Sequence, residues 1–423
     1  MKVIVVGGGA AGFFGAIACA EAWPNAQITI LEAGSHPLSK VRISGGGRCN
    51  VTHACFEAAQ LIQHYPRGGK ALRGAFSRFQ PSDTVAWFAK RHVSLKTEAD
   101  GRMFPTTDDS ETIVTALMHE AQALGVRVKT KAVVTDVRLN PQDPVNDPGK
   151  KNREKRFGVD LKGGHTLMCD RLLLATGSNP KGYAIARHLG HELHPPVPSL
   201  FTFQIPDEQL HHLAGISLDH VQAQIHCPGH PVIKQEGPIL MTHWGVSGPV
   251  ILKLSAWGAR LLHDCRYQAT LRINWSPHHT VDQVRTALTE FKQDNTKRAI
   301  ATANPFSFPR RLWEYLLHTS SPDSAIQGGD RWANLSKKEI NRLVTAITQG
   351  ELKIHGKGIF KDEFVTCGGV SLKTVNFKTM ESRPCPGLYF AGEILDIDGV
   401  TGGFNFQSAW TTGWIAGQAM GAE

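Results

Sequence analysis

The chain has 423 residues, of which 41% are hydrophobic and 20% charged, a composition typical of globular proteins with a sizeable buried core. No apolar run approaches the roughly 20 residues that a membrane-spanning helix requires, so we expect no membrane-embedded segment. The formal charge of +9 at pH 7 attracts polyanions in general, but it identifies no partner by itself.

The cysteines and histidines lack two common metal-site spacings. No two cysteines form a C-x-x-C pair, and the histidines form no H-x-x-x-H pair on a helix. We therefore predict no bound metal, no disulfide framework, and a cytoplasmic protein with reduced thiols. The cysteines are Cys19, Cys49, Cys55, Cys169, Cys227, Cys265, Cys367 and Cys385.

The N-terminal residues have the pattern of a Rossmann βαβ unit. Val3–Val6 is a short apolar strand of the parallel-sheet type. The alanine-rich stretch Ala10–Trp23 is predicted to be a helix, and Gln27–Leu31 is predicted to be the second strand.

The glycines between the first strand and the helix fit the dinucleotide fingerprint. Gly7-x-Gly9-x-x-Gly12 opens the helix, and the acid Glu32 follows Gly12 by 32 − 12 = 20 residues. Gly7 allows the tight turn, Gly9 lets the backbone approach a pyrophosphate, and Gly12 lets the helix pack on the strand. The Glu32 carboxylate is suited to a ribose and disfavours a 2′-phosphate, which predicts FAD or NAD rather than NADP.

A second glycine-rich segment, Ser44–Asn50, follows this unit. Its three consecutive glycines let a ligand approach the backbone closely and expose amide groups to it. Arg48 in the loop, or Lys40 or Arg42 before it, can neutralise pyrophosphate charge. We interpret the segment as a cofactor contact.

The α/β pattern continues beyond this loop. Helices are predicted to begin at Pro81 and Ser110, and a strand to cover Val126–Thr130. The polar stretch Asn140–Arg156 is rich in lysine and arginine; we interpret it as a solvated hairpin tip, with a nucleic-acid contact as the alternative. Leu172–Gly177 is a core strand that enters a glycine turn.

The pattern changes near Pro195–Pro198, which indicates a domain boundary. Short alternating segments from Leu200 to Ile273 predict antiparallel β structure, and strand and glycine-turn character returns near Phe364. The predicted divisions are a first FAD-binding part (1–194), a β-rich insertion (195–275), a helical insertion (276–350), a return strand (351–365) and the C-terminal FAD-binding part (366–423).

Two capping-box motifs mark helix starts in the helical insertion. Thr280-x-x-Gln283 and Ser336-x-x-Glu339 each place a hydroxyl and an acid or amide at the spacing that satisfies free amide groups of a first helical turn.

The C-terminus carries a second flavin-type motif. Gly387–Glu393 is predicted to be a strand entering a Gly-acid turn, with Glu393 binding a ribityl hydroxyl. A further glycine turn, Gly402–Asn405, leads into a helix whose N-terminus stabilises negative charge on a reduced flavin ring. The two ends together predict one FAD site. Its predicted contacts are Gly7, Gly9, Ala10, Ala11, Gly12, Glu32, Ala33, Lys40, Ser44, Gly45, Gly46, Arg48, Cys49, Asn50, Val133, Thr176, Gly177, Gly392, Glu393, Asp396, Gly402, Gly403, Phe404 and Asn405.

Five segments together resemble the bacterial NAD(P)/FAD-dependent oxidoreductases of the aminoacetone-oxidase-like family, and the resemblance covers essentially the whole chain. They are Ser44–Asn50, Gly101–Pro105, His243–Pro249, Lys378–Ser382 and Gly392–Asn405. The resemblance implies an α/β protein whose Rossmann-like FAD-binding domain is interrupted by a β-barrel-like insertion and a helical insertion. Members are linked to amine oxidation, to reduction of conjugated C=C bonds and to dihydrouridine formation in ribosomal RNA. More distant similarity extends to folate- and FAD-dependent tRNA methyltransferases.

Two residues are candidates for catalysis. Cys49 follows Arg48, and a thiol beside a cation can be acidified and act as a proton donor or nucleophile; packing against the cofactor is the favoured alternative. Arg102 is expected either to line the substrate side or to cap a turn.

These features predict an FAD-dependent oxidoreductase that passes hydride between flavin N5 and a small molecule held between the FAD domain and the insertion. No second complete glycine fingerprint follows Gly177, so NAD(P)H is expected to bind transiently if it is the donor. The first alternative is an enzyme that reduces uridine in ribosomal RNA, and the second is an amine oxidase or a non-catalytic flavin-binding protein. The cations that favour RNA are Arg67, Lys70, Arg73, Arg78, Lys297, Arg298, Arg310 and Arg311.

Overall fold

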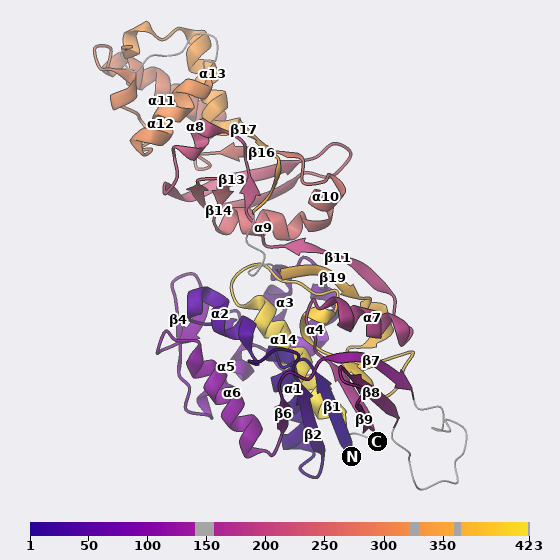
Figure 1. Ribbon diagram of the computed structural model, residues 1–423. Coiled ribbons are helices and arrows are strands. Elements are labelled where there is room, and N and C mark those ends of the chain that lie inside the picture. The colour runs from indigo at the N-terminus through magenta and orange to yellow at the C-terminus, as the bar shows by residue number, and fades with distance from the viewer. Residues whose placement is uncertain (140–155, 321–329, 359–364, 422–423) are drawn as a thin grey trace. The chain divides into compact units, whose positions relative to one another are not determined.

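The computed structural model describes residues 1–139, 156–320, 330–358 and 365–421. It divides into two compact units (Figure 1). Unit 1 comprises Met1–Val197 and Val365–Glu423, and unit 2 comprises Pro198–Phe364. Unit 2 is therefore an insertion in the sequence of unit 1.

A mostly parallel seven-stranded sheet forms the centre of unit 1. N-terminal and C-terminal strands lie side by side in it, since Leu172 and Leu388 are partners in one parallel pair of strands. This pairing closes the domain on both sides of the insertion. In sheet order, the strands are β20 (Val375–Asn376), β21 (Glu381–Ser382), β22 (Leu388–Phe390), β10 (Arg171–Leu174), β1 (Lys2–Val6), β2 (Gln27–Leu31) and β6 (Arg127–Lys129).

Three smaller sheets surround this core. They contain β3, β5 and β4, then β7, β8 and β9, and finally β11 and β19. Pro195–Pro198, predicted from sequence to be a boundary, lies within β11. The bounds are β3 (Thr52–His53), β4 (Leu95–Thr97), β5 (Arg102–Pro105), β7 (Val134–Leu139), β8 (Phe157–Leu161), β9 (Thr166–Cys169), β11 (Leu193–Ser199) and β19 (Val365–Val370).

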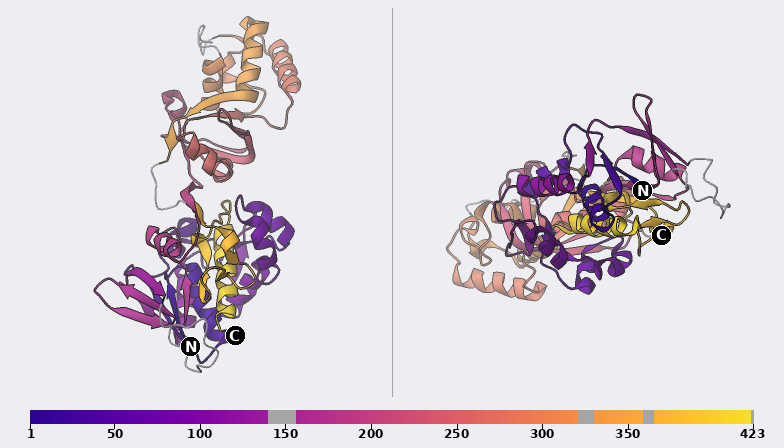
Figure 2. Two further views of the ribbon diagram at one scale, coloured as in Figure 1. Left: turned by 90° about the vertical axis from the view of Figure 1, so that its right-hand side faces the viewer. Right: turned by 90° about the horizontal axis from the view of Figure 1, so that it is seen from below.

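The first and last helices of unit 1 pack closely against each other (Figures 1 and 2). A Cβ at Gly413 would lie 2.7 Å from the carbonyl oxygen of Ala11, and one at Gly417 would lie 2.4 Å from that of Gly15. Only glycine permits this approach. The helices are α1 (Ala10–Ala22), α2 (Ser39–Gly47), α3 (Ala58–Leu61), α4 (Gly69–Phe76), α5 (Pro81–Ala89), α6 (Glu111–Ala123), α7 (Pro180–His188) and α14 (Phe404–Ala419).

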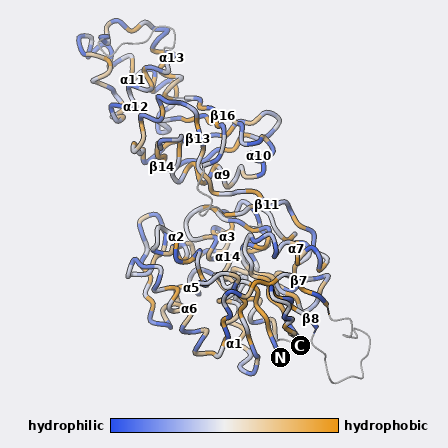
Figure 3. The backbone as a smooth tube through the Cα atoms, in the orientation of Figure 1, coloured by the Kyte–Doolittle hydropathy of each residue, from blue (hydrophilic) through white to orange (hydrophobic). Residues whose placement is uncertain are grey.

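Hydrophobic residues concentrate in the central strands and in α1, as the hydropathy colouring of Figure 3 shows. The inner residues of β1 and the whole of Leu172–Leu174 in β10 are buried. Among the described residues, no helix is both long and apolar enough to cross a bilayer.

Unit 2 is built on a seven-stranded sheet that curls towards a barrel. Its two edge strands, β17 and β18, are separated in the chain by His355 alone, so the two edges of the sheet meet. The predicted α/β fold with a barrel-like insertion is confirmed. In sheet order, the strands are β17 (Gly350–Ile354), β16 (Ala269–Asn274), β13 (Ser217–His226), β14 (Ile233–Thr242), β15 (Gly245–Ser247), β12 (Phe203–Gln204) and β18 (Gly356–Lys357).

Both capping boxes start helices as predicted. The Thr280 hydroxyl accepts from the Gln283 amide, and the Ser336 hydroxyl accepts from the Glu339 amide. The helices of unit 2 are α8 (Glu208–His211), α9 (Pro249–Trp257), α10 (Ala259–Asp264), α11 (Val281–Asp294), α12 (Arg310–Ser320) and α13 (Lys337–Gln349).

Three sequence predictions differ from the structure or extend beyond it. The stretch predicted as continuous β structure contains α9 and α10; Pro249 occupies the first turn of α9, where its missing N–H has no cost. Cys227 and Cys265 form a disulfide, so the prediction of reduced thiols throughout is wrong. Residues 140–155 of the basic stretch, and 359–364 of the predicted return strand, lie outside the described residues.

Candidate functional site

The glycine fingerprint forms a turn with distinct roles for its three glycines. Gly7 has φ +108°, and a Cβ there would lie 2.3 Å from the Ala175 oxygen. A Cβ at Gly12 would lie 2.0 Å from the Gly7 oxygen. Gly9 differs, because a Cβ there meets no atom within 4 Å. Gly7 and Gly12 are thus required by the fold, whereas Gly9 faces open space at the N-terminus of α1.

Glu32 lies at the end of β2, against this turn. Its Oε2 accepts from the Gly8 amide at 2.8 Å and its Oε1 from the Gly34 amide at 2.6 Å. Ala33 follows Glu32 in the chain. The residue before Val133 also lies beside Glu32, because the Ala132 amide donates to the backbone carbonyl oxygen of Glu32 at 2.8 Å. The acid is fixed, and each of its oxygens retains a lone pair for a further donor.

Thr176 and Gly177 follow β10 on the other side of the turn. A Cβ on Gly7 would lie 3.1 Å from the Thr176 Cα. The Thr176 hydroxyl is buried and has no hydrogen-bond partner among the described residues. The hydroxyl packs against Gly182 of α7, where a Cβ would lie 1.9 Å from the Thr176 oxygen.

The N-terminal and C-terminal motifs meet at two points. Gly392 lies against the first turn of α1, which begins Ala10-Ala11: a Cβ on Gly392 would be 2.8 Å from that of Ala11. The Asn50 amide, oriented to satisfy both of its ends, donates to the Thr52 oxygen and accepts from the Gly403 amide, each at 3.0 Å. Motifs more than 300 residues apart in sequence therefore form one continuous surface.

The segment Ser44–Asn50 is the irregular end of α2. Ser44 is extended, with its hydroxyl donating to the Val41 oxygen at 2.9 Å. Gly45, Gly46 and Gly47 all have positive φ, from +58° to +84°, and a Cβ on Gly46 or Gly47 would meet nothing within 4 Å. The backbone of these two glycines is open to a ligand.

The turn Gly402-Gly403 precedes α14 with φ values of +129° and +90°. Asn405 closes the preceding loop, accepting from the Gly399 amide and donating to the Gly399 oxygen, both at 2.9 Å. Phe404 stacks against two histidines, with its ring centroid 4.6 Å from that of His53 and 4.3 Å from that of His64, and the two histidine rings are 6.0 Å apart. These histidines were not predicted as site residues. The position of His53, directly after the glycine loop, was the available signal.

Lys40 and Glu393 pair with each other. The Lys40 Nζ lies 2.6 Å from Glu393 Oε2, and the other Glu393 oxygen accepts from the Thr366 amide at 2.9 Å. The predicted contacts of Lys40 with pyrophosphate and of Glu393 with ribityl remain predictions. Asp396 is buried, and its backbone amide donates to the Val370 oxygen.

Arg48 and Arg102 share one acid. Glu98 accepts from Arg48 at 2.7 Å through Oε1 and lies 3.0 Å from Arg102 through Oε2. Arg48 lies over the ring of Phe104, 4.0 Å from its centroid, and its hydrogen bond with Glu98 raises its pKa. Both guanidinium groups are thus already partnered, and their predicted roles in binding or catalysis remain predictions.

Cys49 is fully buried and has φ +60°. Burial raises the pKa of its thiol to about 12, although a hydrogen bond with Ser44 acts in the opposite direction. This pKa shift is opposite to the acidification by Arg48 that the sequence left open, and a catalytic role for Cys49 remains a prediction. A neutral, buried thiol favours the alternative that Cys49 packs within the site.

The residues present fit a dinucleotide whose pyrophosphate occupies the open side of Gly9. The fit rests on that open space, the fixed acid and the exposed glycine backbone of the second loop.

Residues 1–419 match the family model described as the HI0933-like protein Rossmann domain. The chain belongs to this family. It is an FAD-dependent oxidoreductase.

Two curated relatives cover nearly the whole chain. The chain is 30% identical to a ribosomal RNA dihydrouridine synthase of Haemophilus influenzae, over 99% of this chain and 98% of that protein. It is 29% identical to a 3-dehydro-bile acid delta(4,6)-reductase of Clostridium scindens, again over 99% and 98%.

A solved structure has a similar fold. A 3-ketosteroid-delta4-(5alpha)-dehydrogenase from Rhodococcus jostii is matched with a TM-score of 0.50 at 15% identity, over 100% of this chain and 97% of that one. This likeness supports the arrangement of the fold alone.

Proposed function

We propose that this oxidoreductase reduces a C=C bond conjugated to a carbonyl group. The structural observation that carries the proposal is the hydrogen-bonded junction of the two glycine motifs through Asn50 and Gly403, which would let one site contact both ends of FAD. Bound FAD, once reduced by an electron donor, would supply hydride from N5. Reduction of such a bond adds hydride to the β-carbon and a proton to the α-carbon, leaving a saturated carbonyl compound.

The names of the two relatives support this substrate class. A Δ4,6-reductase acting on a 3-dehydro steroid and a dihydrouridine synthase both saturate a C=C bond conjugated to a carbonyl. The chemistry common to both is a more economical proposal for this chain than either substrate alone.

The chain's own residues would contribute binding and electrostatics. Glu32 would accept from the adenosine ribose, and the Gly402 amide with the N-terminus of α14 would stabilise negative charge on the reduced ring. Cys49 would pack against the site as a neutral thiol, and Arg102 would stay paired with Glu98 at its edge.

We also propose NAD(P)H as a transiently bound electron donor. The fingerprint at Gly7–Gly12 is occupied by FAD in this scheme, and the sequence holds no second complete one. Mixing the purified enzyme with NADH or NADPH without oxygen should bleach the flavin absorbance.

The decisive test is reoxidation of the reduced enzyme by candidate acceptors. A conjugated enone steroid, a uridine-containing RNA and a saturated analogue of each would be mixed anaerobically with it. Return of flavin absorbance with the unsaturated compounds only would support the proposal. Reduction of the oxidised enzyme by a primary amine would support an amine oxidase instead, and no reaction with any compound would favour a non-catalytic flavin protein.

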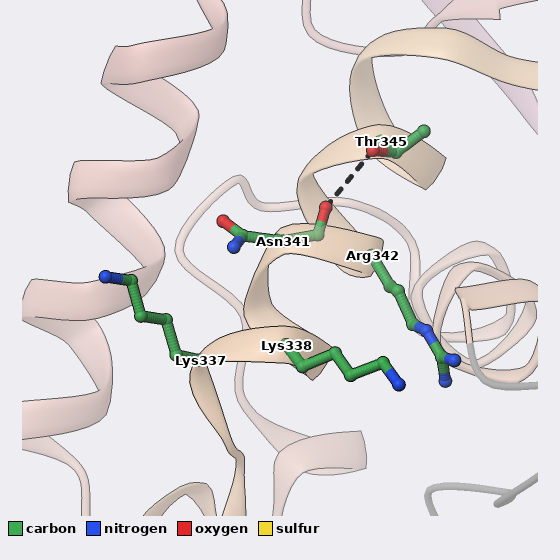
Figure 4. Close-up of a pocket in the computed structure, with 5 residues that line it drawn as sticks. All are labelled: Lys337, Lys338, Asn341, Arg342 and Thr345. Carbon is green, nitrogen blue, oxygen red and sulfur yellow. Dashed lines mark hydrogen bonds between the residues drawn. The ribbon is translucent and has the colours of Figure 1, made fainter.

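Uridine in ribosomal RNA is the second candidate, favoured by a basic face on the helical part of unit 2. Lys337, Lys338 and Arg342 of α13 line a hollow together with Asn341 and Thr345. In Figure 4, Lys338 and Arg342 point to one side of the helix and Lys337 to the other. Cations on both sides of one helix can each contact phosphate groups of a nucleic acid.

The cations predicted from sequence divide into two groups. Lys70, Arg73 and Lys297 have exposed side chains that remain candidates for phosphate contacts. Arg67 is paired with Asp398, and Arg311 donates to the His212 oxygen at 2.9 Å. Three other arginines donate to neighbouring groups. Arg78 donates to the backbone oxygen of Lys378, Arg298 to the side-chain oxygen of Asn295 and Arg310 to the carboxylate of Glu314.

RNA binding as a function of salt tests this candidate. Replacing Lys337 and Lys338 with alanine should flatten the log–log salt dependence by roughly 1.4–1.8, at about 0.7–0.9 per phosphate contact. The matched control replaces Arg127 and Lys129, two exposed residues at β6, and alters net charge equally. Equal effects of the two pairs would refute a localised RNA face. Nucleoside mass spectrometry of RNA from deletion and parent cells would then show whether dihydrouridine is lost.

A further inference from the structure

The tip of the β13–β14 hairpin holds a cysteine and a histidine side by side. Cys227 directly follows β13, and Pro228-Gly229 forms a turn closed by the His230 amide donating to the Cys227 oxygen at 3.1 Å. Gly229 has φ +77°. Proline followed by glycine with positive φ is the pattern of a type II turn, which brings its first and fourth residues together.

A second cysteine reaches the same place from the end of α10. Cys265 caps this helix, its amide donating to the Leu261 oxygen at 3.0 Å. Arg266 and Tyr267, directly after it, both have positive φ, +52° and +58°. Two successive non-glycine residues in this region cost of order 1–3 kcal/mol each, and such strain is concentrated at functional sites.

The three potential ligand atoms lie close together. The sulfurs of Cys227 and Cys265 and a ring nitrogen of His230 are all within 4.8 Å of one another. A tetrahedral Zn²⁺ with bonds of roughly 2.0–2.3 Å spaces its ligand atoms roughly 3.3–3.8 Å apart. Small side-chain rotations would bring the three ligand atoms to the spacing of a tetrahedral zinc site.

We propose that Cys227, His230 and Cys265 form a zinc site in the reduced protein, with water or an external ligand in the fourth position. Two thiolates and an imidazole are ligands that Zn²⁺ prefers. The Cys-x-x-His turn has the short ligand spacing of metal sites, which the search for C-x-x-C pairs did not detect. The proposal therefore revises the prediction that the chain binds no metal.

The disulfide and the metal site are alternative states of the same two sulfurs. The Cα–Cα distance is 6.9 Å, just beyond the roughly 4.4–6.8 Å usual for disulfides, and a disulfide gives His230 no role. All three residues belong to unit 2, whereas the proposed flavin contacts belong to unit 1. Bound zinc would tie the hairpin tip to the end of α10.

Zinc content of the full-length flavoprotein tests the proposal. Protein purified under reductant, incubated with Zn²⁺ and desalted should hold about one zinc per chain by inductively coupled plasma mass spectrometry. Cys265→Ser and His230→Ala should each lower this at least about tenfold, with flavin content unchanged. Cys55→Ser is the matched control, since Cys55 is a free, half-buried thiol of unit 1, and it should retain the metal.

His230→Ala separates the two states, because a disulfide survives loss of the imidazole whereas zinc affinity does not. Cobalt substitution adds a spectroscopic readout: intense d–d bands with a thiolate charge-transfer band are expected for the wild type and lost in both site variants. Absence of zinc from a wild type with both thiols free would overturn the proposal. So would a Cys227–Cys265 disulfide that persists under reductant, or equal zinc loss in Cys55→Ser.

Discussion

Gly9 provides the sharpest test of the cofactor site, because the fold does not need a glycine there. Its backbone is extended, with φ −91° and ψ −170°, which valine adopts readily. A Cβ at Gly9 meets no protein atom within 4 Å. Gly9→Val should therefore leave the apoprotein folded, with stability unchanged or raised by about 0.4–1 kcal/mol. Its side chain should nonetheless occupy the pyrophosphate path.

The expected change in the free energy of unfolding follows from the linkage between FAD binding and folding. FAD at 100 times its dissociation constant stabilises the wild type by about 2.7 kcal/mol, and Gly9→Val should lose most of this. Urea unfolding of apo and FAD-saturated protein measures the difference, and absorbance after gel filtration measures retained flavin. Wild-type protein should release FAD, and not FMN, on denaturation.

Gly12→Val is the matched control. Its Cβ would lie 2.0 Å from the Gly7 oxygen, so it should destabilise the apoprotein itself, by at least about 1–3 kcal/mol. A folded Gly9→Val variant that retains FAD as tightly as wild type would refute the placement of the pyrophosphate. A Gly9→Val variant that is unfolded without FAD would refute the reading of this glycine as free of packing.

Three further outcomes are expected. Cys49→Ala should bind FAD and turn over within a few-fold of wild type, because burial raises the pKa of this thiol to about 12. A fall of about 10²–10⁴ in the rate of flavin reoxidation would instead show that Cys49 is a general acid. Burial lowers the pKa of His191 to about 4, so the unfolded chain binds the extra proton; stability should fall by roughly 2–3 kcal/mol as pH drops from 6.5 to 4, and His191→Gln should lack this slope in urea titrations. Arg67→Met should cost about 3–5 kcal/mol by leaving the fully buried Asp398 without its guanidinium partner; unchanged stability with weakened RNA binding would instead support a phosphate contact.

The α/β core was predictable because its signals are local. The strand before Gly7, the spacing to Glu32 and the capping box at Ser336 each concern a short segment whose conformation depends on its own residues. Helix α9 was missed although Val250, Ile251 and Leu254 have helical spacing and are buried, because the surrounding alternation suggested strands.

The partners of charged side chains could not be predicted in this way. Lys40 meets Glu393 across 353 positions, and Arg48 meets Glu98 across 50. In each pair, a carboxylate neutralises a cation that was predicted from the sequence to contact pyrophosphate. The same holds for Cys49, whose neighbour in sequence is a cation but whose environment in the fold is apolar enough to raise its pKa.

This contrast explains why the cofactor is better defined than the substrate. The contacts proposed for FAD are largely backbone: glycines that expose amides, a helix N-terminus and an acid fixed by two backbone donors. Backbone shape is encoded by glycine spacing, which is visible in a sequence. A substrate is selected by side chains whose availability depends on long-range pairing, as the engagement of Arg67 by Asp398 illustrates. Discrimination between an enone and a uridine in RNA therefore depends on which cations remain unpaired in the fold, and the paired variants at Lys337 and Lys338 address that question directly.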